Sequence, residues 1–273
     1  MELGREIIEF TRTDLARLFR SGKGLVLLLL YGLVEGAGGV LFAVLSRSGM
    51  GQLMNSGLLA AVASGGDKAL AERLQQIPVP VLFAYWFTLF VMPLLVLLMG
   101  FDQISGELSS RSVRYLAFRS RRSSWALGKA LAQLVALFGL SLVANVVVLG
   151  VSFATVPNIA IGPALFWLVV LWLLSIVYGM AYVALVTLVS TWFRTPFLAL
   201  VAGAVVLVVM GIVGLLGRWV DALHPLIYLL PGTYSSGLIS PNLGTAAMSI
   251  VALVAFAVVF LGGAIGVLRA RDL

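Results

Sequence analysis

The chain has 273 residues, of which 61% are hydrophobic and 11% are charged, and its formal net charge is +7. A soluble domain averages about 25% charged residues, and a water-soluble fold of this length could not bury so much apolar side chain. The positive charges lie in the breaks between apolar runs, without the aromatic interleaving of single-strand binders, which argues against nucleic acid and for anionic lipid headgroups as partners.

Residues 2–20 are predicted to form an amphipathic helix that lies in the plane of the lipid headgroups. At about 100° per residue, one half of the helical wheel is apolar and the other half is charged. The apolar half holds Leu3, Ile7, Ile8, Phe10, Leu15, Leu18 and Phe19. Acyl chains would cover this arc, whereas a solvated tail would leave it in water. The segment carries acids, unlike the basic start of a cleaved signal peptide, so we expect it to be retained.

Six apolar stretches are long enough to cross a hydrocarbon core as helices, which takes about 20 residues each. They cover residues 25–45, 80–101, 127–151, 164–190, 197–217 and 245–268. Helices are expected because lipid offers no partner for backbone N–H and C=O groups, and because the runs lack the alternation of barrel strands. The sequence therefore predicts an all-α, polytopic membrane protein that forms a single transmembrane domain over residues 1–273.

The placement of lysine and arginine predicts that both termini lie in the cytoplasm. Of the 18 basic residues, 14 fall at the two termini or around the breaks after the second and fourth spans, and 4 fall on the other side. Loops rich in Lys and Arg stay in the cytoplasm. We expect a multi-pass protein of a cell membrane, specifically a bacterial cytoplasmic membrane.

The segment 218–244, before the last span, is too apolar for a solvated loop and too broken for another span. His224-Pro225, Pro231-Gly232 and Ser240-Pro241 interrupt it. Short re-entrant or interfacial helices are expected there, with their ends buried by protein.

No stretch of the sequence matches the phosphate-binding loop G-x-x-x-x-G-K-[ST]. The Gly-Lys pairs at 22–23 and 128–129 lack the leading glycine and the following Ser or Thr. The single histidine, His224, has only Asp221 nearby as a further ligand, and no G-x-S-x-G motif surrounds Ser236. We therefore expect no catalytic residues, metal site or cofactor in the chain itself.

The most informative polar break is the segment 102–129, after the second span. It has acids at its start, an amphipathic middle and a basic end. A short helix parallel to the membrane is expected over residues 105–120, and its exposed surface would suit a soluble partner. Anchoring by headgroups accounts for part of the positive charge.

The order of residues in this segment resembles the permease subunits of type-2 ATP-binding-cassette (ABC) transporters. The likeness rests on Gly106-Glu107, the step Ser112-Val113-Arg114, a basic turn and Gly128-Lys129. The N-terminal helix, six spans, the broken segment before the last span and the Arg-Asp-Leu ending are also similar to that family, so the resemblance covers essentially the whole chain. The sequence departs from the family at Arg111, where Gly is usual, and at Ser120, where Pro is usual.

The resemblance implies two six-span subunits, as a homodimer or heterodimer, and separate cytoplasmic ATPase subunits that hold ATP and Mg²⁺. The ATPases would dock on the coupling helix over residues 105–120, and their closure would tilt it and open a path outward, which is export by alternating access. The residues that the resemblance assigns to docking are Glu107, Ser112, Val113, Arg114, Leu116, Arg119, Arg121 and Arg122. The resemblance leaves the substrate open. It also allows that the subunits transmit the force of the ATPases to an extracytoplasmic partner protein and do not move a solute.

Two other classes of function stay open on the sequence alone. An ion-coupled secondary transporter would need several intramembrane charges and inverted repeats, and Glu35 is the one acid within the predicted spans. A membrane enzyme would need a catalytic constellation. An ATPase encoded beside this gene would favour the ABC permease over both.

Overall fold

The computed structural model describes residues 2–20, 22–47, 67–110, 121–155, 160–217 and 219–271, and every regular element in them is helical. The α-helices are α1 (Glu2–Arg20), α2 (Gly22–Arg47), α5 (Lys68–Gln75), α6 (Val79–Gly100), α7 (Ser105–Ser109), α9 (Arg122–Thr155), α10 (Ile161–Trp192), α11 (Pro196–Leu216), α12 (His224–Ile227) and α13 (Leu243–Ala270). The 3₁₀ turns are η1 (Asp221–Leu223), η2 (Pro231–Tyr234) and η3 (Gly237–Ile239).

By length and composition, α6, α9, α10, α11 and α13 can each cross a membrane. They coincide with five of the six predicted spans. The remaining span, residues 25–45, falls in α2, whose apolar part among the described residues is Gly24–Gly38. The side chain of Glu35 in α2 lies outside the described residues. The predicted all-α fold is confirmed and the chain is a multi-pass membrane protein, whereas the sixth crossing stays a prediction.

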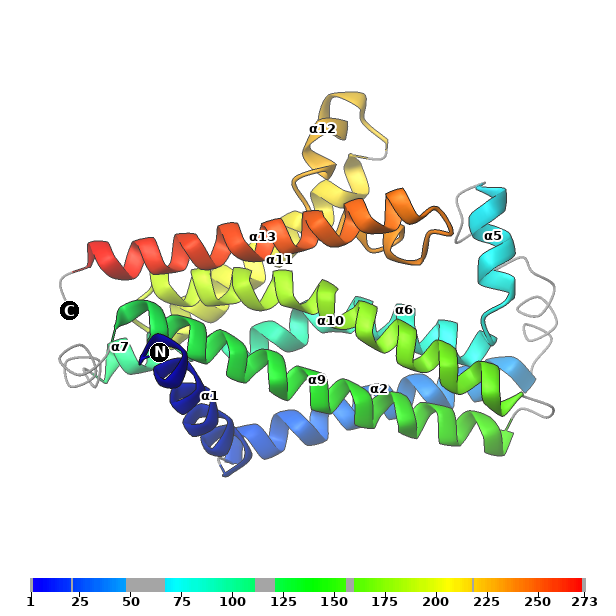
Figure 1. The fold of residues 1–273 in the computed structure, drawn as a ribbon, viewed down its shortest axis with the longest axis horizontal. Helices are drawn as coiled ribbons and strands as arrows, with labels where there is room; N and C mark the ends of the chain where they lie inside the picture. Colours follow the sequence, from blue (N-terminus) through cyan, green and yellow to red (C-terminus); the bar gives the residue numbers. More distant parts are fainter. Residues whose placement is uncertain are drawn as a thin grey trace.

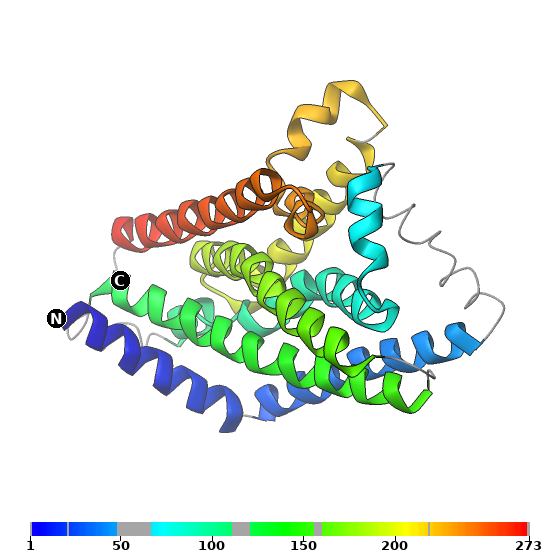
Figure 2. The ribbon, with the colours of Figure 1, turned by 45° about the vertical axis from the view of Figure 1, so that its right-hand side comes forward.

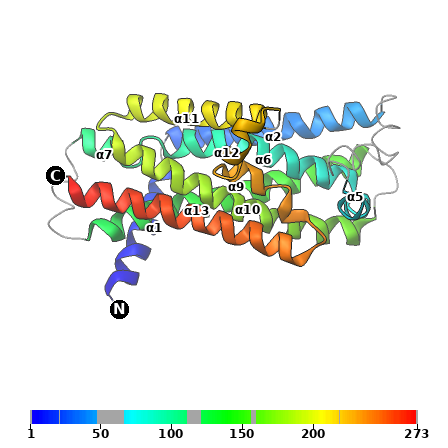
Figure 3. The ribbon, with the colours of Figure 1, turned by 90° about the horizontal axis from the view of Figure 1, so that it is seen from above.

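The long helices run lengthwise beside one another between two ends of a bundle (Figures 1 and 3). One end, which we call the α7 end, carries α7 and both ends of the described chain, and α5 lies at the opposite end. Helix α1 lies obliquely to most of the long helices at the α7 end (Figures 1 and 3) and runs along one side of α9 (Figure 2). A chain that runs along the bundle an even number of times has both of its ends at the same end of the bundle, as observed here.

Helix α10 occupies the middle of the bundle and packs against α6, α9, α11 and α13. Small residues permit these close crossings. A Cβ added at Gly179 would come within 2.7 Å of Met92 Sδ and 2.8 Å of Leu137 Cδ2. A Cβ at Gly100 would overlap the side-chain amide of Gln133. Membrane helices associate by such close approach, because lipid tails are as apolar as the helix surfaces themselves.

Helices α11 and α13 expose large apolar side chains along their whole length. Val205, Val208 and Leu215 on α11, and Val251 and Val258 on α13, are each more than half exposed. In water a contiguous apolar face of this extent would cause aggregation, whereas lipid tails cover it without cost. The exposed surface therefore agrees with the membrane setting that the composition indicates.

Short helical turns fill the segment between α11 and α13. Thr233 Oγ1 donates a hydrogen bond to the carbonyl of Ile227 at 2.6 Å, which ties η2 back to α12. Asn242 caps α13, since its Oδ1 accepts a hydrogen bond from the N–H of Gly244 at 2.9 Å. How this segment lies relative to the membrane stays a prediction.

Candidate docking region at the α7 end

The turn between α6 and α7 is held by one buried serine of α10. Ser190 Oγ accepts hydrogen bonds from the N–H groups of Ile104, at 3.2 Å, and Ser105, at 3.1 Å. The same hydroxyl donates to the carbonyl of Phe101 at 2.9 Å. These backbone groups lie between α6 and α7, where no regular helix provides their hydrogen bonds. The Ser190 hydroxyl provides them instead. Helix α7 is thereby fixed to the centre of the bundle.

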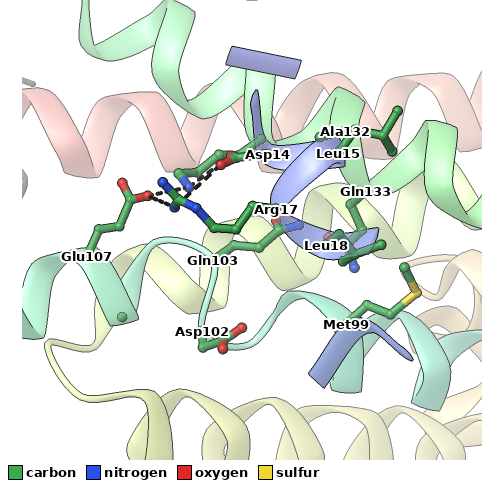
Figure 4. A pocket seen from close by; sticks show the side chains of 13 residues that line it. Asp14, Leu15, Arg17, Leu18, Met99, Asp102, Gln103, Glu107, Ala132 and Gln133 are labelled. Atoms are coloured by element: carbon green, nitrogen blue, oxygen red, sulfur yellow. Dashed lines mark hydrogen bonds and ion pairs between the residues drawn. The ribbon is translucent and has the colours of Figure 1, made fainter. Parts of the chain in front are cut away.

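Glu107 of α7 takes part in an ion-pair cluster with α1 and α9 (Figure 4). Its Oε1 lies 2.8 Å from Lys129 Nζ and 3.0 Å from Arg17 Nη1. Asp14 Oδ2 lies 2.9 Å from the same Lys129 nitrogen, and Asp14 Oδ1 lies 3.6 Å from Arg17 Nη1. The indole N–H of Trp125 donates to Glu107 Oε2 at 3.0 Å. We call these five residues the Lys129 cluster.

The Lys129 cluster is shielded from solvent on its inner side. The side chain of Lys129 is 3% exposed, and those of Glu107 and Asp14 are 15% and 16% exposed, whereas Arg17 is 64% exposed. A buried ammonium is tolerated when carboxylates pair with it and satisfy its hydrogens. Lys129 meets two carboxylates and also lies 5.9 Å from the centre of the Trp125 ring. The cluster therefore joins α1, α7 and α9 through charged contacts, which add to the apolar packing of α1 against the bundle.

Close contact between α1 and α9 brings the cluster together, and Gly128 makes that contact possible. A Cβ at this position would overlap Phe10 Cβ and lie 3.2 Å from the carbonyl oxygen of Ile7. Thr11 Oγ1 donates to the carbonyls of Ile7 at 2.8 Å and Gly128 at 3.2 Å. The two residues of the Gly128-Lys129 pair thus have separate roles. The small Gly128 lets α1 approach α9 closely, and Lys129 forms an ion pair with Asp14 of α1.

Helix α1 divides its apolar residues between the bundle and the outside. Phe10, Leu15 and Leu18 are half-buried against the bundle. Ile8 and Phe19, at 68% and 45% exposed, remain outside. The helical wheel of the sequence placed all of these on one lipid-facing half. In the structure, one part of that apolar half packs against the bundle, and the other part stays available to acyl chains.

Two arginines cap the ends of α13 and α10 at the α7 end. Arg122 Nη1 donates to the carbonyls of Leu268 at 2.8 Å, Arg271 at 2.9 Å and Arg269 at 3.2 Å. Arg271 in turn donates to the carbonyl of Trp192, the last residue of α10. Partial burial and then the nearby Arg194 lower the pKa of the Arg271 guanidinium from its usual range. Cations at helix C-termini satisfy orphan carbonyls and oppose the negative end of the dipole.

Replacement of Arg122 by Ala is expected to loosen the end of α13. Hydrogen bonds from a charged donor contribute about 1.5–3 kcal/mol, so amide exchange over residues 265–271 should accelerate by roughly tenfold or more. Hydrogen–deuterium exchange measured by mass spectrometry reads this directly. The matched control is Arg121→Ala, which changes an exposed neighbour. Equal exchange in both variants would contradict the cap.

The structure places three of the eight predicted docking residues. Glu107 lies in the Lys129 cluster, Arg122 lies at the end of α13, and Arg121 is exposed at the start of α9. The others lie outside the described residues and stay predictions. They are Ser112, Val113, Arg114, Leu116 and Arg119. Of the predicted coupling helix 105–120, α7 provides Ser105–Ser109.

Sequence reasoning did not identify Asp14, Arg17 or Trp125 as members of a site. One signal was present, because Asp14 follows Phe10 and precedes Leu18 at helical spacing. An acid within the buried stripe of an amphipathic helix requires a cationic partner. The partner, Lys129, is 115 residues further along the chain. Only the fold shows that pairing.

Within the described ranges, no group of three or more His, Asp or Glu side chains is arranged to hold a metal ion. The fold defines the class of protein as an all-α, multi-pass membrane protein whose helices meet in an ion-pair cluster at one end. No family model matches the chain, and no curated protein matches it.

Proposed function

We propose that this chain is the permease subunit of a type-2 ABC transporter that works as an exporter. It would pair with a second permease subunit and with cytoplasmic ATPase subunits that bind ATP and Mg²⁺. The proposal rests on the resemblance of segment 102–129 to the coupling region of that family. The observation that best supports it is the Lys129 cluster, which fastens α7 to α1 and α9.

A docking segment can transmit force only if the helices behind it move with it. Ser190 fixes the start of α7 to α10, and Glu107 fixes α7 to Lys129 of α9 and Arg17 of α1. A push on the residues that follow α7 therefore reaches three other helices through direct polar contacts. Rigid coupling of this kind lets an ATPase stroke shift a two-state bundle.

The competing ion-coupled mechanism draws no specific support from the described residues. It requires several charged side chains within the spans. Among the described residues that are buried, Lys129 is the one that carries a charge, and it is paired with Asp14 and Glu107. A polar cluster at one end of a bundle suits a mechanical link better than a path for ions.

Co-purification of this chain with a candidate ABC ATPase subunit tests the proposal. Arg114→Glu and Leu116→Asp are each expected to weaken association by about tenfold or more, because like charges or an unpaired carboxylate in an interface cost several kcal/mol. The control is Lys68→Glu in α5, at the opposite end of the bundle. Unchanged association and unchanged ATP-dependent transport in both docking variants would refute the assignment.

A further inference from the structure

Five arginines lie at the α7 end, where α9 begins and where α10 and α13 end. They are Arg121, Arg122, Arg194, Arg269 and Arg271. Arg122 Nη1 donates to the carbonyl of Arg271 at 2.9 Å, and Arg271 donates in turn to the carbonyl of Trp192 at the end of α10. Arg194 lies close enough to Arg271 to repel its charge. We call these five residues the arginine cluster.

The arginine cluster has no carboxylate to balance it among the described residues. The ion pairs found there involve Arg5, Arg17 and Lys129, and none includes an arginine of the cluster. Asp272 lies outside the described residues, and its charge, counted against the five arginines, still leaves a net charge of +4. The carbonyls at the helix ends carry only partial charges. An anion would therefore stabilise the cluster, because it would relieve the repulsion between like charges.

The guanidinium of Arg271 indicates what kind of anion fits. Its Nη2 donates to the carbonyl of Trp192, whereas its buried Nη1 has no hydrogen-bond partner among the described residues. A buried donor without an acceptor is costly. The two nitrogens belong to one planar group, so the missing acceptor lies beside the end of α10. Phosphate oxygens match the forked donors of a guanidinium, and several of them can bind more than one arginine at once.

The surface beside the arginine cluster is apolar and exposed. Trp192, the last residue of α10, is 56% exposed, and Phe197 in the first turn of α11 is 71% exposed. Val201 and Val205 continue this exposed face along α11 at helical spacing. Tryptophan at the end of a span is typical of the headgroup level of a bilayer. A phospholipid would cover the exposed face with its acyl chains, whereas a free phosphate ion would gain nothing from it.

We propose that the arginine cluster binds the phosphate of an anionic phospholipid whose acyl chains lie along α11. The phosphate oxygens would accept hydrogen bonds from Arg271 Nη1 and from the exposed guanidinium of Arg194. Phosphatidylglycerol has this chemistry. Phosphatidylethanolamine and phosphatidylcholine carry a cation beside the phosphate, so they would bring no net charge to the arginines. The proposal concerns lipid binding alone and does not depend on the chain being a transporter subunit.

The first arm of the test uses the whole protein in detergent with equal amounts of phosphatidylglycerol, phosphatidylethanolamine and phosphatidylcholine. Native mass spectrometry counts the lipids that the protein retains, and the wild type is expected to prefer phosphatidylglycerol. Arg194→Gln and Arg271→Gln should each reduce that preference by about tenfold, the effect of losing one charge-assisted hydrogen bond. Arg271→Gln also removes the cap of α10, so Arg194→Gln, which leaves that cap in place, is the decisive variant.

The matched control is Arg12→Gln, which removes one exposed arginine from α1 at the same end of the bundle. Arg12 forms no ion pair with the described residues, as is true of Arg194. This control should retain phosphatidylglycerol as the wild type does. Equal losses in Arg12→Gln and Arg194→Gln would show a general attraction of anionic lipid to basic surface instead of a site, and would overturn the proposal.

The second arm separates the lipid from a free phosphate ion and uses the protein in nanodiscs. Phosphatidylglycerol added to phosphatidylcholine is expected to raise the melting temperature of the wild type and of Arg12→Gln, but not that of Arg194→Gln. Inorganic phosphate, added to nanodiscs of phosphatidylcholine at an ionic strength matched with chloride, should leave all three unchanged. A rise with inorganic phosphate that Arg194→Gln abolishes would assign the cluster to a free anion and overturn the lipid proposal.

Equal retention of the three lipids by the wild type overturns the proposal as well, and leaves the arginines to an acidic surface of a soluble partner. None of these measurements involves an ATPase, so their failure leaves the transporter proposal untouched.

Discussion

Replacement of Lys129 by Met is expected to lower the free energy of unfolding by about 3–5 kcal/mol, the usual cost of removing one partner from a buried ion pair. The variant leaves the carboxylates of Asp14 and Glu107 close together, with the exposed Arg17 as their remaining cation. Equilibrium unfolding of the detergent-solubilised protein measures the change. The control is Arg5→Met, which breaks the Arg5–Glu9 pair on the exposed face of α1, where an ion pair contributes about 0–1 kcal/mol.

A triple variant separates unpaired charge from lost packing. Lys129→Met combined with Asp14→Asn and Glu107→Gln removes both carboxylates together with the ammonium. Replacement of an entire buried ion network by uncharged residues often changes stability little. Most of the free energy of unfolding that Lys129→Met loses should therefore be recovered. If the triple variant is as unstable as Lys129→Met alone, the cluster stabilises the fold through packing and not through charge.

Replacement of Gly128 by Leu is expected to push α1 away from α9. The new side chain would occupy the place of Phe10, and such overpacking costs about 1–3 kcal/mol. Because α1 carries Asp14 and Arg17, its displacement also breaks the Lys129 cluster. Limited proteolysis with trypsin measures the result, since cleavage after Arg12 and Arg17 should become faster.

The matched control for Gly128→Leu is Gly139→Leu in the same helix. A Cβ at Gly139 would have no heavy atom within 4 Å, so this variant adds the same bulk without a clash. Its α1 should resist trypsin as the wild type does. Equal rates of cleavage in the two variants would show that α1 is not held against Gly128.

The amino-acid pattern predicted most of the helices because lipid imposes a simple requirement on them. A run such as 197–217 must be helical and about 20 residues long wherever it lies in the bundle, and α11 extends over Pro196–Leu216. The break between α10 and α11 was also visible, because Pro196 suits the first turn of a helix. These features depend on local sequence and solvent alone.

The Lys129 cluster could not be predicted in the same way, because its members come from three distant parts of the chain. The rule for basic residues assigned Lys129 and Arg122 to the headgroup region, whereas their side chains contact carboxylates and helix ends of the protein itself. The number of basic residues in a loop indicates on which side of the membrane that loop lies. It does not indicate which groups the basic side chains contact.

The order of residues in the Lys129 cluster has a consequence for biosynthesis. Asp14, Arg17, Glu107 and Trp125 all precede Lys129 in the chain, so both carboxylates have been synthesised before the lysine that they neutralise leaves the ribosome. Chains fold from the N-terminus during synthesis. The ammonium at the start of α9 therefore never has to enter the bundle ahead of its counter-ions, and α1 can close onto α9 as soon as that helix is in place.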